Sequence, residues 1–192
     1  MARPRQFDEQ QVIESLMQVF WDKGYEATSM QDLVEASGLL KGSLYGAFGD
    51  KQSLYLAALD HYDRTRLQAG IDMLYGAGSA RQKISGLFDS VIESVENGVF
   101  AGGCLLCNAS LEMAAANQRV GNEVDKMIRR LHAAVIAAID SPELPDDRVQ
   151  DLAASIVSAY CGSRVLAKAG SPVDMIRATR DRCIEFLNPG AK

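Results

Sequence analysis

Two cysteines separated by two residues form a pair that could do chemistry. Cys104 and Cys107 follow two glycines, at the start of a segment whose pattern predicts a helix. A thiol at a helix N-terminus loses its proton more readily, so the pair could sense oxidants or electrophiles. The alternative is that both are small side chains that pack in the core. Zinc would need two further ligands, and His61 and His132 stand alone, so we expect no metal site.

Asn108 and Glu112 lie one turn apart on the same predicted helix, which is otherwise apolar. A buried carboxylate needs a partner, and a ligand, Arg129 or Arg130, or a helix end could supply it. The middle helices therefore predict a pocket for a small-molecule effector of unspecified identity, although each apolar residue taken alone is better explained as core. The predicted lining residues are Phe88, Ile92, Phe100, Leu105, Asn108, Leu111, Glu112, Met127, Leu131 and Tyr160.

The spacing of the polar residues does not assemble a catalytic site. The sequence lacks a paired-histidine metal motif, a glycine loop that would cradle phosphates, and a nucleophile elbow. Its serines, histidines and aspartates are isolated from one another. We therefore expect no enzyme, no catalytic residue and no cofactor.

Helices must position the side chains named above, because the spacing of apolar residues is helical along the whole sequence. Apolar residues recur at helical spacing from Val12 to Phe20 behind an N-cap at Asp8, and Gly24 ends this helix. Thr28 with Gln31 has the form of a capping box. Further helices are predicted up to Gly38, around 41–48, from 51 into the low seventies, and over 80–96, 104–116, 118–140, 146–169 and 172–187. No stretch alternates as a strand would, so the predicted fold class is all-α.

The composition is that of a globular protein. Its hydrophobic content is 47% over 192 residues, enough for a core, and the formal net charge is −5. The first residues show no apolar secretion signal, and no apolar run approaches the ~20 residues of a membrane span. We expect a cytoplasmic protein with reduced thiols and no membrane partner.

Residues 28–48 have the pattern of a helix-turn-helix. Ala36 and Gly38 are small residues at the bend, and Leu33, Leu44 and Phe48 can fix the angle between the two helices. The second helix carries mainly short side chains on its outer face, as a helix pressed into a DNA groove requires.

This stretch resembles the DNA-binding domain of the TetR family of repressors. Leu44-Tyr45, Phe48 and Lys51 have the spacing of that family's recognition helix, and the match spans roughly residues 8–60. The resemblance implies an N-terminal three-helix helix-turn-helix domain in residues 1–50 and a C-terminal helical ligand-binding and dimerisation domain in residues 51–192. It implies a transcriptional regulator, favoured as a repressor, that leaves a palindromic operator on a small-molecule, redox or electrophile signal.

The resemblance also implies which residues bind the phosphates. Tyr45 would offer a hydroxyl and Lys51 an ammonium. Thr28 and Ser29 open a helix whose free N–H groups and positive dipole end also suit a phosphate.

Base contacts would come from the outer face of the recognition helix. Lys41 would face guanine acceptors, and the methyl group of Ala47 would face a thymine methyl, with Ser43 beside them. Arg3 and Arg5 lie on an N-terminal arm that could reach a minor groove. The predicted DNA-binding residues are Arg3, Arg5, Thr28, Ser29, Lys41, Gly42, Ser43, Tyr45, Gly46, Ala47 and Lys51.

Two features set this sequence apart from the pattern. Leu40 stands where many members carry a capping serine or threonine, and residues 1–51 are net acidic. We place the acids on faces turned away from DNA and expect few phosphates to be neutralised per protomer. The alternative function is a helical ligand-binding or adaptor protein whose DNA binding is weak or lost.

The last two predicted helices are the candidate homodimer interface. Each carries an apolar stripe, and two helices from each protomer could form a four-helix bundle. The alternative is that these stripes close the protomer's own core. The predicted interface residues are Leu152, Ile156, Ala159, Tyr160, Ser163, Ile176, Arg180, Cys183 and Leu187.

Overall fold

The computed structural model describes residues 8–98, 102–139 and 144–188, and these residues form helices and connecting turns with no strand. None of the helices in these ranges is both long and apolar enough to cross a membrane. The α-helices are α1 (Glu9–Lys23), α2 (Met30–Ser37), α3 (Lys41–Phe48), α4 (Lys51–Tyr62), α5 (Gln68–Tyr75), α6 (Ala80–Glu96), α7 (Leu105–Glu112), α8 (Gln118–Ile139), α9 (Asp146–Lys168) and α10 (Val173–Glu185). The all-α prediction is confirmed.

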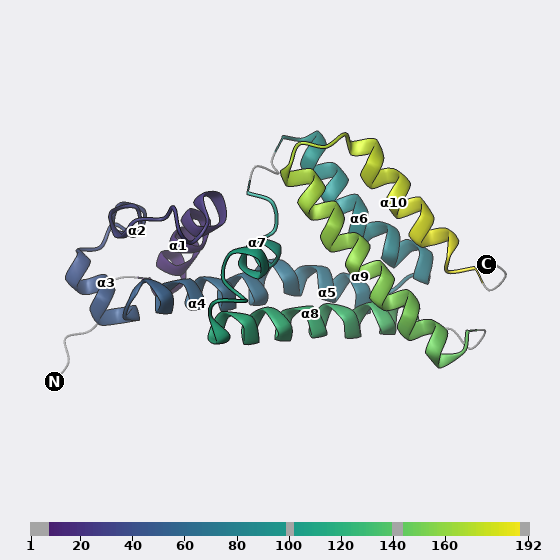
Figure 1. Ribbon diagram of the computed structural model, residues 1–192, viewed down its shortest axis with the longest axis horizontal. Coiled ribbons are helices and arrows are strands. Elements are labelled where there is room, and N and C mark those ends of the chain that lie inside the picture. The colour runs from purple at the N-terminus through teal and green to yellow at the C-terminus, as the bar shows by residue number, and fades with distance from the viewer. Residues whose placement is uncertain (1–7, 99–101, 140–143, 189–192) are drawn as a thin grey trace.

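The molecule is elongated, with α1, α2 and α3 at one end (Figure 1). A long helical rod made of α4 and α5 runs from these helices along the molecule, and α8 lies beside it. The helices α6, α9 and α10 pack together at the other end. The short α7 lies between the two ends and contacts α1, α4, α8 and α9. α7 is therefore one of the elements that join the N-terminal helices to the rest of the chain.

Local signals explain most helix boundaries. Asp8 is the N-cap of α1, because its carboxylate accepts the backbone N–H groups of Gln10 and Gln11. Gly38 ends α2 with a φ of 66°, a left-handed conformation that favours glycine. The predicted helix at 104–116 is shorter in the structure, since α7 already ends at Glu112.

The capping box predicted for Thr28 and Gln31 is wrong by one residue. The reciprocal hydrogen bonds join Ser29 and Asp32 instead. Thr28 is buried, and its hydroxyl donates to the Gly24 carbonyl at 2.6 Å, which closes the turn between α1 and α2. A carboxylate one residue further along is the better acceptor, and this shifts the start of the helix.

The rod is interrupted by one π-helical segment, Asp63–Leu67, which the sequence analysis did not predict. The preceding apolar residues Tyr55, Leu59 and Tyr62 are buried at helical spacing, and the next buried apolar residue is Leu67, five positions on. A π turn takes up this extra residue and returns the apolar stripe to the core.

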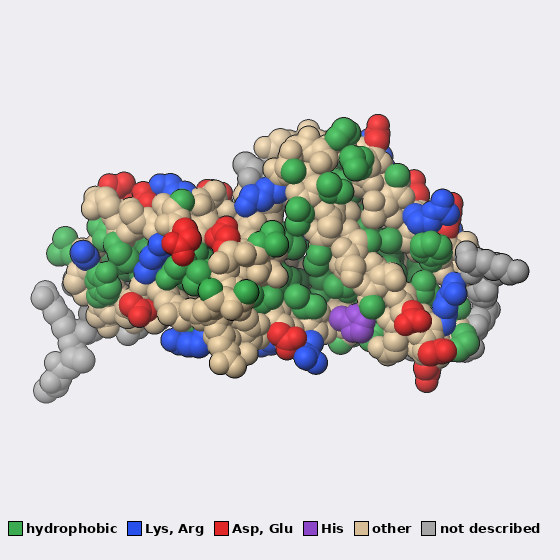
Figure 2. All heavy atoms as spheres, in the orientation of Figure 1, with side chains coloured by type: hydrophobic (Ala, Val, Ile, Leu, Met, Phe, Trp, Pro, Cys, Tyr) green, Lys and Arg blue, Asp and Glu red, His purple; other side chains and the backbone are tan. Residues whose placement is uncertain are grey.

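One continuous core joins both ends of the molecule. Phe20 of α1 packs edge-on against Tyr55 of α4 with 5.0 Å between ring centroids. Figure 2 shows hydrophobic side chains also reaching the surface in the middle of one face, over α7, α8 and α9. The N-terminal helices are therefore packed onto the rod rather than tethered to it.

Candidate functional site

The helix-turn-helix is fixed from its inner side. Leu33 of α2 and Leu44 of α3 are both fully buried. The Gly38 turn leads into α3 through Leu40, which caps the helix without a side-chain hydrogen bond, as the sequence predicts. This anchoring leaves the opposite face of α3 free to meet a partner.

The outer face of α3 is open and nearly bare. Lys41, Ser43 and Tyr45 are exposed. A Cβ atom added at Gly42 or Gly46 would meet no atom within 4 Å. A surface without side chains at these two positions, one helical turn apart, allows another molecule to approach the backbone of α3 closely. The predicted residues Lys41, Gly42, Ser43, Tyr45 and Gly46 thus share one surface, with Ala47 half-buried at its edge.

Two lysines beside this surface are positioned by aromatic rings. The ammonium of Lys51 lies 4.4 Å from the ring centroid of Tyr25, and that of Lys41 lies 5.9 Å from the ring centroid of Tyr45. Burial raises the pKa of Tyr25, so its ring stays neutral. Cation–π contact holds each ammonium near the surface of α3, and neither lysine forms a salt bridge among the described residues.

Thr28 and Ser29, which were also predicted to bind phosphate, are not held by aromatic rings in this way. Thr28 is only 1% exposed and its hydroxyl is engaged with Gly24, so the structure corrects its prediction as a DNA contact. Ser29 is exposed at the start of α2, and its hydroxyl hydrogen-bonds Asp32. Arg3 and Arg5 lie outside the described residues.

Asp32 makes the start of α2 pH-dependent. A hydrogen bond from Lys23, followed by those from Ser29, lowers the pKa of Asp32 from its usual 3.8 to about 2. A lowered pKa stabilises the fold above pH 3.8, and the benefit is lost as the pH falls towards 2. Asp32→Asn should therefore lower the melting temperature near neutral pH but make little difference near pH 2. Thermal unfolding followed by circular dichroism measures this, with Glu35→Gln on the same helix as the control.

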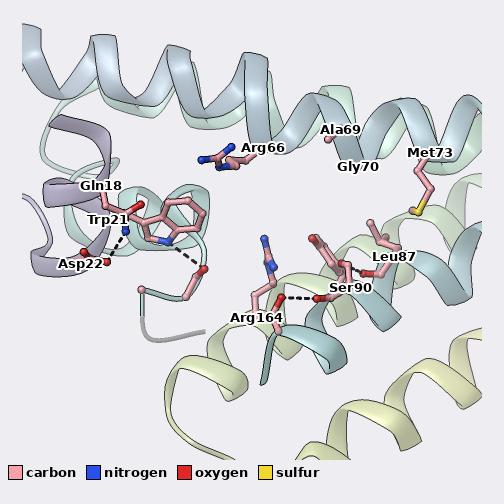
Figure 3. Close-up of a pocket in the computed structure, with 14 residues that line it drawn as sticks. Gln18, Trp21, Asp22, Arg66, Ala69, Gly70, Met73, Leu87, Ser90 and Arg164 are labelled. Carbon is pink, nitrogen blue, oxygen red and sulfur yellow. Dashed lines mark hydrogen bonds between the residues drawn. The ribbon is translucent and has the colours of Figure 1, made fainter. Parts of the chain in front are cut away.

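A cavity of about 580 Å³ lies between the N-terminal helices and the rest of the chain. Trp21 of α1, Arg66 of the π segment and Arg164 of α9 all line it (Figure 3). The Trp21 indole N–H donates to the Gly103 carbonyl at 3.1 Å, and Arg66 pairs with Glu14 of α1 at 2.5 Å. The remaining lining residues are Gln18, Asp22, Ala69, Gly70, Met73, Leu87, Ser90, Ser94, Gly102, Gly103 and Tyr160.

The predicted ligand-binding residues are mostly not at this cavity. Tyr160 lines it, and burial raises the pKa of its hydroxyl to about 12. Leu131 lines a small adjoining cavity, Leu111 is 77% exposed, and Phe100 lies outside the described residues. The rest of the apolar set fills the core: Phe88, Ile92, Leu105 and Met127. The apolar pattern alone could not separate lining residues from core.

Asn108 and Glu112 are structural links rather than pocket walls. The Asn108 amide donates to the Gly102 carbonyl at 3.0 Å and accepts from Lys168 at 2.9 Å. Glu112 is exposed, and its carboxylate accepts the backbone N–H of Tyr25 at 2.7 Å, just after α1 ends. Of the partners considered for Glu112, the structure therefore supplies the helix end.

The predicted interface residues divide between the surface and the interior. Leu152, Ile156, Ala159 and Cys183 line a groove of about 380 Å³ between α9 and α10, and Leu187 is half-buried. Tyr160, Ser163 and Ile176 are buried and are not among the residues that line this groove. Arg180 forms ion pairs with Asp89 and Asp181 of its own chain.

The chain is similar to known proteins over nearly its whole length. Residues 12–58 match the model described as bacterial regulatory proteins, tetR family, and residues 80–181 match the tetracyclin repressor-like C-terminal domain. Among curated proteins, it is 25% identical to the uncharacterized HTH-type transcriptional regulator YezE of Bacillus subtilis, over 98% of this chain and 100% of that one. It is 30% identical to the HTH-type transcriptional repressor ComR of Escherichia coli, over 63% of this chain and 58% of that one.

Solved structures agree with this family. A cysteine mutant of the TetR family regulator CifR, complexed with 26-bp double-strand operator DNA, is 31% identical with a TM-score of 0.73, covering 95% of this chain and 98% of that one. The regulator from Cytophaga hutchinsonii gives a TM-score of 0.78 at 21% identity, over 95% of this chain and 96% of that one. The helix α3 is exposed, and the fold is shared with TetR-family structures. The chain is a DNA-binding transcriptional regulator that belongs to the TetR family.

Proposed function

We propose that the protein is a repressor that binds a palindromic operator as a homodimer and is released when a small molecule enters the cavity beside Trp21. The observation that supports it best is the bare face of α3. Gly42 and Gly46 leave the helix backbone open to the floor of a major groove, while Lys41 and Tyr45 flank it. Double-strand operator DNA is also the partner named for the similar regulator CifR.

We place the dimer contact on the α9–α10 face. A single short recognition helix reads too few base pairs to be selective, so two copies must act on half-sites about 34 Å apart. The groove there offers apolar surface, including Ala159 and Phe186, to a second copy. Two helices from each protomer would then form a four-helix bundle.

Release would act through the contacts of the cavity with α1. Gln18, Trp21 and Asp22 of α1 line the cavity directly, opposite Arg164 of α9. A ligand that binds more tightly at one separation of α1 and α9 favours that separation and so shifts α1. The shift of α1 changes the distance between the two recognition helices of the dimer. We assign residues 1–50 to DNA binding and residues 51–192 to sensing and dimerisation, and we infer a cytoplasmic location, where the DNA is.

Lys51→Ala tests the DNA-binding geometry. Loss of one phosphate contact should weaken binding to all DNA sequences and reduce the slope of log affinity against log salt by about 1. A mobility-shift titration at several salt concentrations, with the DNA that flanks the protein's own coding region, measures both quantities.

Lys83→Ala on α6 is the matched control, since it removes a lysine far from α3, and it should change neither quantity. If Lys51→Ala leaves affinity and salt slope unchanged, the proposed docking of α3 is wrong. If wild-type protein binds no duplex from that region more tightly than unrelated DNA, the alternative of an adaptor with lost DNA binding gains support.

A further inference from the structure

Three of the four cysteines lie together where α7 meets α9. Cys104 is the N-cap of α7, and its sulfur lies 3.3 Å from the hydroxyl of Tyr62. The Cys107 thiol is directed at the carbonyl of Cys161, with 3.9 Å between sulfur and oxygen. All three are free thiols, so the cluster holds the two electrons that a disulfide would release.

The positions of Cys104 and Cys107 bring their side chains together. They are the N-cap and N3 residues of α7. The same two positions elsewhere in this chain place side-chain atoms in contact. The Ser29 hydroxyl lies 2.8 Å from Asp32 Oδ2, and the Ser79 hydroxyl lies 3.1 Å from Gln82 Oε1. Cys104 and Cys107 therefore lie on the same side of the first turn of α7, where the two thiols interact directly.

The surroundings give the two thiols different roles. Interaction with the Cys107 thiol, the positive charge of Arg164 and a hydrogen bond from Tyr62 hold the pKa of Cys104 well below its usual range. Interaction with Cys104 and Cys161, together with burial, raises the pKa of Cys107. These shifts favour Cys104 over Cys107 as the nucleophile.

Access to Cys104 selects small reagents. It lines a cavity of about 30 Å³ together with Tyr62, Cys161 and Arg164, and this cavity shares Arg66 and Arg164 with the larger one. This narrow space favours a small oxidant such as a hydroperoxide over a bulky electrophile. Cys107 and Cys161 also line a surface groove of about 220 Å³ in the apolar area of Figure 2.

We propose that Cys104 and Cys107 form a hydroperoxide-responsive pair that closes to a disulfide and loosens α7 from α1. The Cys104 thiolate attacks the distal peroxide oxygen, the O–O bond breaks, and the sulfur becomes a sulfenic acid while the departing oxygen takes a proton. The Cys107 sulfur then attacks the sulfenic sulfur, the S–S bond forms, and the hydroxyl leaves as water with the Cys107 proton. The two thiols lose two electrons and the peroxide gains them.

The turn before α7 transmits this change. Gly103 adjoins Cys104, and its carbonyl accepts the hydrogen bond from the indole of Trp21 on α1. The Trp21 ring also packs edge-on against Tyr62, at 5.1 Å between centroids, and Tyr62 is the hydroxyl partner of Cys104. Moving the Cys104 sulfur onto Cys107 removes the Tyr62 contact and shifts the turn that holds Trp21. The effect on DNA binding rests on the proposed function, but the thiol chemistry does not.

Tryptic peptides separate the four cysteines for the test. Residues 84–119 carry Cys104 and Cys107, residues 149–164 carry Cys161, and residues 183–192 carry Cys183. After a small molar excess of hydrogen peroxide on full-length native protein, the 84–119 peptide should lose two hydrogen atoms and resist alkylation until it is reduced. N-ethylmaleimide on the untreated native protein should label Cys161 before Cys104.

Single serine variants assign the roles. Cys104→Ser should prevent the disulfide, and Cys107→Ser should stop the reaction at a Cys104 sulfenic acid that a 1,3-dione traps. Cys161→Ser, which replaces the third thiol of the cluster, is the matched control and should still form the disulfide between Cys104 and Cys107. Circular dichroism of each variant before oxidation excludes misfolding.

Two results would overturn the proposal. One is an 84–119 peptide that stays alkylatable after peroxide, and the other is a cross-link from it to the Cys161 peptide. Operator affinity of the wild type should fall at least about tenfold on oxidation and recover on reduction. A disulfide that forms without this fall contradicts the coupling to α1. Absence of operator binding in the reduced protein contradicts the proposed function instead. The state of the 84–119 peptide then still tests whether the disulfide forms.

Discussion

Gly46→Leu is expected to reduce operator binding more than tenfold and to leave the protein at least as stable as wild type. The Cβ atom of residue 46 would point into open space, so the fold accepts a larger side chain. Replacing a glycine within a helix typically stabilises it by about 0.5–1 kcal/mol. A leucine on this face would hold α3 away from the groove and remove base contacts worth about 1–3 kcal/mol each.

The opposite signs of the two effects make this variant informative. Thermal unfolding and a mobility-shift titration on the same sample measure them. Ala137→Leu, at an exposed position of α8, is the control and should change neither stability nor DNA affinity appreciably. Unchanged operator affinity for Gly46→Leu would mean that DNA meets another face of the protein.

The helices that could be predicted from the sequence are those with strong local signals. The apolar spacing of α1 behind Asp8 and its end at Gly24 needed no information from elsewhere in the chain. The helix predicted over 80–96 coincides with α6, whose Ser79 N-cap and Gln82 form a capping box. Such boundaries depend on contacts within three or four residues, and a sequence displays these directly.

The π segment had a signal that periodicity at 3.6 residues obscures. The gap between Tyr62 and Leu67 is one residue longer than an α-helix allows, and it is occupied by polar residues. A helical pattern with one extra residue between two apolar positions predicts a π turn at that point. The insertion turns Asp63 inwards, so that a carboxylate is buried in the middle of the rod.

The cavity could not be predicted, because its walls come from segments far apart in the sequence. Trp21, Arg66 and Arg164 meet only after α1 has packed on α4 and α9 has packed on α6 and α8. Each has a plain local explanation, as one aromatic or charged residue on an amphipathic helix. The link from Glu112 to Tyr25 depends in the same way on tertiary packing. Spacing within one helix predicts its faces, but not which helix each face meets.

The buried carboxylate of Asp63 leads to the variant with the largest expected loss of stability. Asp63 is 3% exposed and is paired with Arg130 of α8, which also contacts Gln68. Lys126 is a further partner, at 3.9 Å. Arg130→Met removes the main counter-charge and should cost up to about 3 kcal/mol, the cost being limited because Arg130 is 33% exposed and Lys126 remains. Urea unfolding at fixed protomer concentration measures the change in free energy.

A second substitution separates lost charge compensation from lost packing. Adding Asp63→Leu to Arg130→Met removes the stranded carboxylate and should recover most of the stability, because two apolar side chains can replace a buried ion pair. Arg129→Met is the matched control, since Arg129 is 78% exposed with Asp125 as its partner and should cost at most about 1 kcal/mol. Two results would show that the unpaired Asp63 carboxylate does not cause the loss of stability. One is an equal loss of unfolding free energy in Arg129→Met and Arg130→Met, and the other is no recovery in the double variant. The loss of stability in Arg130→Met would then have to come from the packing of α5 against α8.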